Sequence, residues 1–123
     1  MSSLATLLWV AVGGAAGSVA RALAGWLISS RPPVATLLVN VAGSLLIGWL
    51  MARLGSAEPA SAARWQALLV TGFCGGFTTF STFSWQTLDQ MLKGQWLVAF
   101  ANVALSFSLC LLAVWLGFRF GRA

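Results

Sequence analysis

Long apolar stretches separated by short polar connections run along the whole chain. Each stretch is long enough for a helix to cross a bilayer, which takes about 20 residues. The predicted spans cover roughly residues 4–28, 33–54, 65–91 and 96–120. Between them lie Arg31-Pro32-Pro33, the polar loop Gly55–Arg64 and the turn Lys93-Gly94. These segments account for the full length, so we expect an all-α integral membrane protein with a single four-helix transmembrane domain over residues 1–123.

The third apolar stretch contains a run of residues that does not suit a helix facing lipid. Gly72–Ser84 reads Gly-Phe-Cys-Gly-Gly-Phe-Thr-Thr-Phe-Ser-Thr-Phe-Ser. Each glycine of Gly75-Gly76 costs a helix about 1 kcal/mol relative to alanine, which predicts that the third helix is broken there, in mid-membrane. Irregular backbone and clustered polar groups persist in hydrocarbon only where they are buried in protein or line a water-filled path. The run is therefore a candidate functional site.

The hydroxyl and phenyl groups of this run suit a small ion. Ser81 and Thr82 can donate or accept a hydrogen bond without carrying charge. Phe80 and Phe83 are three residues apart and share a helical face. A phenyl ring is positive at its edge and negative on its face, so edge-on rings would suit an anion and face-on rings a cation. The plainer interpretation has the hydroxyls bonding to their own helix and the rings packing, but the density of the run favours a functional role.

Three motifs, taken together, resemble the Fluc (CrcB) family of fluoride channels. They are Gly13–Arg21, Leu38–Ser44 and Gly72–Ser84, and in this order they extend over nearly the whole chain. The resemblance implies a subunit with four transmembrane helices that assembles as an antiparallel, dual-topology homodimer. It also implies a passive, fluoride-selective channel that lowers cytoplasmic fluoride.

An anion pathway is expected from the polar pattern and the resemblance together. Its expected residues are Arg21, Asn40, Phe80, Ser81, Thr82, Phe83 and Ser106. The resemblance implies that Asn40 lies where a vestibule meets the pore and donates its amide N–H groups to the anion. The alternative is a structural role, in which Asn40 forms hydrogen bonds between helices. Arg21 either lines an aqueous vestibule or extends toward the lipid headgroups.

The resemblance further implies one bound cation. This is a structural sodium ion on the two-fold axis, held by the backbone carbonyls of Gly75 and Thr78 from both antiparallel subunits. The alternative is that Gly75-Gly76 simply lets helices cross closely with their hydrogen-bond ladders intact.

Composition and charge bear on the other function classes. Charged residues make up 7% of the chain, against roughly 25% in a soluble domain. The net charge is +5, but the basic residues are scattered rather than arranged in a stripe, so no nucleic-acid partner is expected.

No span interior holds a histidine, carboxylate or lysine for acid–base chemistry, which argues against an enzyme. The alternative is a small multidrug-resistance-type, proton-coupled cation transporter, which would need a glutamate in the first span, where this chain has no acid.

The distribution of basic residues bears on orientation in the membrane. With four spans, the two termini and the second connection share one side, which holds Arg53, Arg64, Arg119 and Arg122. The other side holds Arg31 and Lys93, and Arg21 if it reaches that interface. So weak a bias under the positive-inside rule is compatible with insertion in both orientations, which would give an antiparallel homodimer. We expect a multi-pass protein of a bacterial inner (plasma) membrane.

Overall fold

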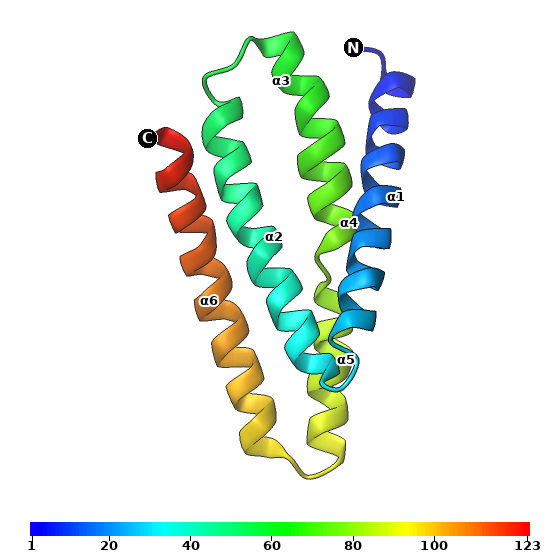
Figure 1. Cartoon of the computed structure of the whole chain (residues 1–123), viewed down its shortest axis with the longest axis vertical. Helices are drawn as coiled ribbons and strands as arrows, with labels where there is room; N and C mark the ends of the chain where they lie inside the picture. The colour runs from blue at the N-terminus through cyan, green and yellow to red at the C-terminus, as the bar shows by residue number, and fades with distance from the viewer.

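Four long helical spans form the molecule, and a computed structural model describes residues 1–123 (Figure 1). The uninterrupted helices are α1 (Ser3–Leu27), α2 (Pro32–Leu54) and α6 (Trp96–Arg122). The remaining span, Pro59–Leu92, is composite, and all four spans are long and apolar enough to cross a membrane. Both termini and the connection between α2 and α3 lie at the same end of the molecule (Figure 1), as expected for a chain with four spans.

Local signals explain where the first two helices begin. α1 starts one residue before the predicted span because the Ser2 side chain caps it by accepting a hydrogen bond from the Ala5 N–H over 3.2 Å. α2 starts at Pro32, since a proline is readily accommodated in the first helical turn. The predicted turn before α6 is confirmed, and Gly94 in it has a positive φ of 75°, which glycine adopts without strain.

The third span consists of four segments. They are α3 (Pro59–Trp65), the π-helix η1 (Gln66–Cys74), α4 (Gly75–Phe77) and α5 (Phe80–Leu92). The prediction of a loop throughout Gly55–Arg64 was wrong, because α3 starts within it. The Glu58 carboxylate accepts hydrogen bonds from the N–H groups of Ala60 and Ser61 and so caps α3. The hydrophobic pattern did not predict the π-helical stretch.

The third span is interrupted, but not at the predicted glycines. Thr78 and Thr79 are extended, with ψ angles of 158° and 115°, whereas Gly75 and Gly76 lie within helix α4. The low helix propensity of glycine is outweighed here by packing, because Gly76 lies against the Gly14 backbone of α1. The interruption instead falls where the Thr79 side chain caps the next helix, α5.

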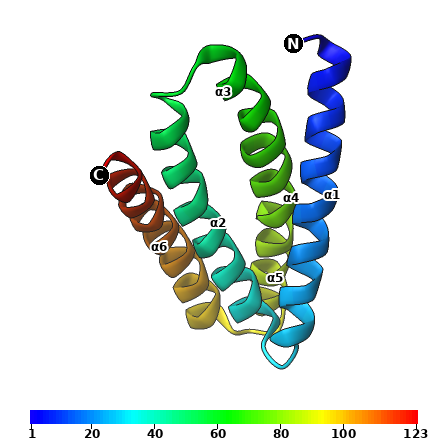
Figure 2. The same ribbon diagram turned by 45° about the horizontal axis from the view of Figure 1, so that its top comes forward.

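Glycines allow the helices to pack in two close pairs. α1 lies against η1 and α4, and α2 lies against α6 (Figures 1 and 2). A Cβ on Gly13 would collide with the Leu68 carbonyl, and one on Gly17 with the Phe73 carbonyl. Gly13 and Gly17 thus let the backbones of α1 and η1 approach closely.

Buried and exposed residues are distributed as in a protein that faces lipid. The buried residues are mostly small or hydroxyl-bearing, such as Ala99, which has no exposed surface. Large apolar side chains point outward instead, with Leu27 86% and Leu97 81% exposed. Five tryptophans near the ends of the spans are also exposed, as residues at the membrane interface often are: Trp26, Trp49, Trp65, Trp96 and Trp115.

Candidate functional site

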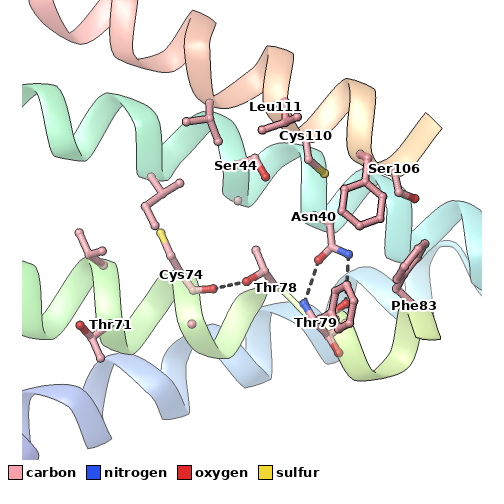
Figure 3. Close-up of a pocket in the computed structure, with 17 residues that line it drawn as sticks. Asn40, Ser44, Thr71, Cys74, Thr78, Thr79, Phe83, Ser106, Cys110 and Leu111 are labelled. Atoms are coloured by element: carbon pink, nitrogen blue, oxygen red, sulfur yellow. Dashed lines mark hydrogen bonds between the residues drawn. The ribbon is translucent and has the colours of Figure 1, made fainter. Parts of the chain in front are cut away.

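An asparagine of α2 stabilises the interruption in the third span. Asn40 Nδ2 donates to the Thr79 carbonyl oxygen over 3.1 Å, and Asn40 Oδ1 accepts from the Thr79 N–H over 2.8 Å (Figure 3). The carboxamide thus pairs with the extended backbone of Thr79 as a neighbouring strand would. These backbone groups would otherwise lack partners inside hydrocarbon. The interhelical hydrogen bonding that was the structural alternative for Asn40 is therefore present, and a second Nδ2 hydrogen remains for a ligand.

Two carbonyls at the interruption lose their helical donors. In a continuous helix, the Thr79 N–H would bond to the Gly75 carbonyl and the Thr82 N–H to the Thr78 carbonyl. Instead the Thr79 N–H donates to α2, and the Thr82 N–H donates to Thr79 Oγ1 over 3.1 Å. The Thr78 carbonyl accepts one longer bond, from Arg21 Nη1 over 3.4 Å. Backbone oxygens of Gly75 and Thr78 are thereby released from the helical ladder.

An open groove of about 440 Å³ lies between α2, the third span and α6. Four of the residues predicted for the anion pathway line it: Asn40, Phe80, Phe83 and Ser106. Both residues predicted to hold sodium, Gly75 and Thr78, line the same groove. In Figure 3, Asn40 and Thr79 lie in the middle of the view, with Phe83 and Ser106 on one side of them and Ser44, Cys74 and Thr71 on the other. Most of the lining is apolar, so its few polar groups stand in a low-dielectric setting.

Phe80 and Phe83 differ in their surroundings although they share a helical face. Their ring centroids are 5.5 Å apart with planes inclined by 47°. Phe83 is 7% exposed and makes an edge-to-face contact with Phe107 of α6, at 6.1 Å and 80°. Phe80 is 70% exposed at the groove. Phe80, Phe83 and Phe107 thus form an aromatic cluster in which Phe80 remains exposed.

A second cavity, of about 480 Å³, lies on the other side of the interruption, between α1, α2 and α5. Arg21 and Thr82 line it together with the half-buried Gln86, whose Oε1 is buried without a hydrogen-bond partner. Because Arg21 lines this cavity and bonds to the Thr78 carbonyl, its side chain points into the protein. Thr79 lines both the cavity and the groove and so lies between them.

The structure thus divides the predicted pathway residues into two sets. The groove set contains Asn40, Phe80, Phe83 and Ser106, and the cavity set contains Arg21 and Thr82. Ser81 lines neither space; its hydroxyl lies 3.3 Å from that of Thr79.

A polar network ties α5 to α6 below the aromatic cluster. Asn102 Nδ2 donates to Thr87 Oγ1 over 3.0 Å, and the Thr87 hydroxyl donates to the Phe83 carbonyl over 2.8 Å. Hydrogen bonds between membrane helices hold their relative rotation as well as their separation. This network sets the position of α5 against α6, where Phe83 and Ser106 face the groove.

Comparison with known proteins places the chain in a family. The sequence model described as CrcB-like protein, Camphor Resistance (CrcB), matches residues 8–118. The chain belongs to the CrcB family. A protein of Paramagnetospirillum magneticum named fluoride-specific ion channel FluC is 46% identical over 118 residues, which cover 91% of each chain. Proteins of the same name from Coxiella burnetii and Methylocella silvestris are 40% and 43% identical, over 94% and 89% of this chain and 97% and 88% of theirs.

The CrcB match contains every residue predicted for the anion pathway and for the sodium site, and the predicted resemblance is confirmed. With its four spans and bacterial relatives, this CrcB chain is a multi-pass protein of a bacterial membrane.

Three residues of the CrcB site were not selected from the sequence: Thr79, Gln86 and Phe107. Thr79 and Gln86 carried a usable signal, because with Thr82 they recur at helical spacing within an apolar stretch. Phe107 carried none, since it is one apolar residue among many on α6. Only the contact with Phe83 distinguishes it.

Proposed function

We propose that this protein is a passive, fluoride-selective channel that lowers cytoplasmic fluoride, and that it is not an enzyme. The observation that carries the proposal is its relationship to proteins named fluoride-specific ion channel, which extends over nine tenths of the chain. The site is compatible with it. Hydroxyl, amide and guanidinium donors meet phenyl rings around an interruption in a membrane span, at Arg21, Asn40, Thr79 and Phe80.

Fluoride selectivity would follow from how the ion loses its water. A small, strongly hydrated anion sheds water only where several donors replace it at once. In the groove, the second Nδ2 hydrogen of Asn40 and the hydroxyl of Ser106 are donors of this kind, and the cavity has the hydroxyl of Thr82. Ring edges of Phe80 and Phe83 would add weak positive charge without trapping the ion. A path too narrow for chloride would then discriminate by size.

Assembly as an antiparallel homodimer is part of this proposal. The groove is open along one face, and polar groups and interrupted backbone at a lipid-facing surface would be costly. A second copy covering the groove would remove Asn40 from lipid and place Phe80, now 70% exposed, against protein. Weakly biased charge allows the two copies to insert in opposite orientations.

A structural sodium ion at the dimer axis is compatible with the donors present. The Gly75 and Thr78 carbonyls are both released from the helical ladder and both residues line the face that the partner would cover. Unwound backbone carbonyls of this kind are the ligands that sodium finds inside membrane proteins. Arg21 occupies one lone pair of the Thr78 oxygen at 3.4 Å and leaves the other. Bound there, sodium would neutralise inward-pointing dipoles and join the subunits.

Ion flux from liposomes that contain only this protein tests the function. We expect rapid release of fluoride and little release of chloride, with neither requiring a proton gradient. Equal passage of chloride would refute fluoride selectivity. Drug-cation uptake driven by a proton gradient would instead support the transporter alternative, which has no acidic side chain lining either the groove or the cavity to support it.

A further inference from the structure

Helices α5 and α6 form an antiparallel hairpin, joined by the short turn that precedes α6 (Figure 1). The buried residues of α5 are Phe83, Thr87 and Gln90, and their spacing puts them on one face of the helix. On α6, Ser106 is buried and Asn102, one turn earlier, is half-buried. Polar side chains therefore lie inside this hairpin, on both of its helices.

Two contacts determine how the two faces meet. Asn102 Nδ2 donates to Thr87 Oγ1 over 3.0 Å. One turn away, the Phe83 ring meets the Phe107 ring of α6 edge to face, with centroids 6.1 Å apart. In an antiparallel pair, one turn back along α5 corresponds to one turn forward along α6. Pairing of Thr87 with Asn102 therefore places Phe83 opposite Ser106, and both of these residues line the groove.

The Thr87 hydroxyl acts as donor and acceptor at once. It donates to the Phe83 carbonyl over 2.8 Å while it accepts from Asn102, so two partners fix its orientation. No other side-chain hydrogen bond joins α5 to α6, and Gln90, one turn further along, has a buried Oε1 without a partner. Apolar contacts give helices in a bilayer little preference for one register, because lipid tails are as apolar as the side chains. The position of α5 along α6 therefore depends on the bond between Asn102 and Thr87.

We propose that Asn102 and Thr87 are positioning residues of the anion pathway, which hold the Phe83 ring in register with Ser106 and thereby favour fluoride over chloride. This inference rests on the proposed channel function. Neither Asn102 nor Thr87 lines the groove, so both act through Phe83. A small anion loses its water where a ring edge and a hydroxyl donor approach it together. A shift of α5 along α6 separates these two groups, which lowers fluoride flux and admits chloride more readily.

Substitutions of similar shape separate the hydrogen bond from the packing. Thr87→Val removes the hydroxyl and keeps the branched shape, and Asn102→Leu removes the donor but leaves the bond from Thr87 to the Phe83 carbonyl. Thr87→Ser keeps the hydroxyl. Thr6→Val is the matched control, because the Thr6 hydroxyl also donates to a carbonyl four residues earlier, that of Ser2, over 3.1 Å. Thr6 has no side-chain partner on another helix and lines neither the groove nor the cavity.

Release of fluoride and of chloride from liposomes with equal amounts of each variant tests the proposal. Chloride release is corrected for that of liposomes without protein. We expect the ratio of fluoride to chloride release to fall by roughly threefold to tenfold in Thr87→Val and in Asn102→Leu, the factor that one hydrogen bond between membrane helices supplies. Thr87→Ser and Thr6→Val should keep the wild-type ratio. A variant that only folds less well lowers both fluxes together and leaves their ratio unchanged.

Three results would overturn the positioning role. They are a wild-type ratio in both Thr87→Val and Asn102→Leu, an equal fall of the ratio in Thr6→Val, and no recovery of the ratio in Thr87→Ser. With a fluoride-selective wild type, each of them leaves the proposed function standing. A wild type that releases both ions equally refutes the proposed function, and this inference with it.

Thermal unfolding in detergent measures the bond itself, independently of transport. If Asn102 and Thr87 are bonded to each other, the losses of stability in Thr87→Val and in Asn102→Leu should not add up in the double variant. Additive losses would show that the two side chains do not act together, and would overturn the proposal.

Discussion

At the scale of single residues, Phe80 and Phe83 carry the most direct prediction. Each ring replaced by isoleucine loses its edge charge and keeps most of its apolar volume, so we expect fluoride flux to fall by roughly tenfold. Phe100→Ile is the matched control, because Phe100 is 71% exposed, like Phe80 at 70%, but lines neither the groove nor the cavity. Flux is measured in liposomes at equal protein incorporation. Wild-type flux in both the Phe80→Ile and Phe83→Ile variants would show that the rings contribute to packing only.

Asn40 joins two functions in one side chain. Asn40→Asp keeps the acceptor for the Thr79 N–H but loses the donor to the Thr79 carbonyl and introduces an anionic group. We expect fluoride flux to be lost, and stability to fall by about 1–3 kcal/mol where the carbonyl is left buried without a partner. Ser44→Ala, one turn further along the same groove, is the control and should retain flux. Normal fluoride flux in Asn40→Asp would show that Asn40 is not part of the anion pathway.

At the scale of helices, the contact of α1 with η1 depends on the absence of side chains. Gly17→Ala would drive a Cβ into the Phe73 carbonyl, which should destabilise the protein by about 1–3 kcal/mol. Gly25→Ala in the same helix meets nothing within 4 Å and should be neutral, or stabilising by up to about 1 kcal/mol. Thermal unfolding in detergent measures both. Equal melting temperatures would show that α1 is less tightly packed than the glycine contacts indicate.

The start of α3 should depend on pH through its capping carboxylate. Two backbone N–H bonds, from Ala60 and Ser61, lower the pKa of Glu58 below its ordinary value of 4.5. The capping contribution is therefore fully present above 4.5 and is lost as pH falls through the lowered pKa in the folded protein. NMR shifts of the Ala60 and Ser61 amides should report this step, and Glu58→Gln should abolish it. A midpoint above 4.5 would contradict the cap.

At the scale of the whole molecule, the proposed dimer and its sodium ion can be tested together. Replacing sodium by a much larger cation should lower the dimer fraction, because the Gly75 and Thr78 carbonyls of both subunits would then face one another without a bridging charge. Chemical cross-linking in liposomes measures that fraction at constant ionic strength. If the dimer fraction does not change, sodium does not bridge the subunits, and the alternative role of Gly75-Gly76, to let helices cross closely, is supported. If the protein is a monomer in every cation, the proposal that a second copy covers the groove is wrong.

The sequence by itself determined the number of spans and most of their ends. Span length is a local property of apolar runs, and the ends are marked by residues such as Pro32 and Gly94 that act on their immediate neighbours. Hydroxyls and phenylalanines concentrated in Gly72–Ser84 also identified the third span as the site. Their density in a membrane span conflicts with lipid exposure whatever the fold.

Tertiary structure decided where that span is interrupted and which residues face which space. Glycine propensity favoured a break at Gly75-Gly76, but Gly76 packs against α1 and this segment stays helical, while Asn40 of α2 supports extended backbone at Thr79 instead. Helix propensities amount to about 1 kcal/mol per residue. Leaving a backbone N–H or C=O group without a partner in hydrocarbon costs several kcal/mol. Long-range hydrogen bonds therefore set the position of the break, and they join residues 39 positions apart in the chain.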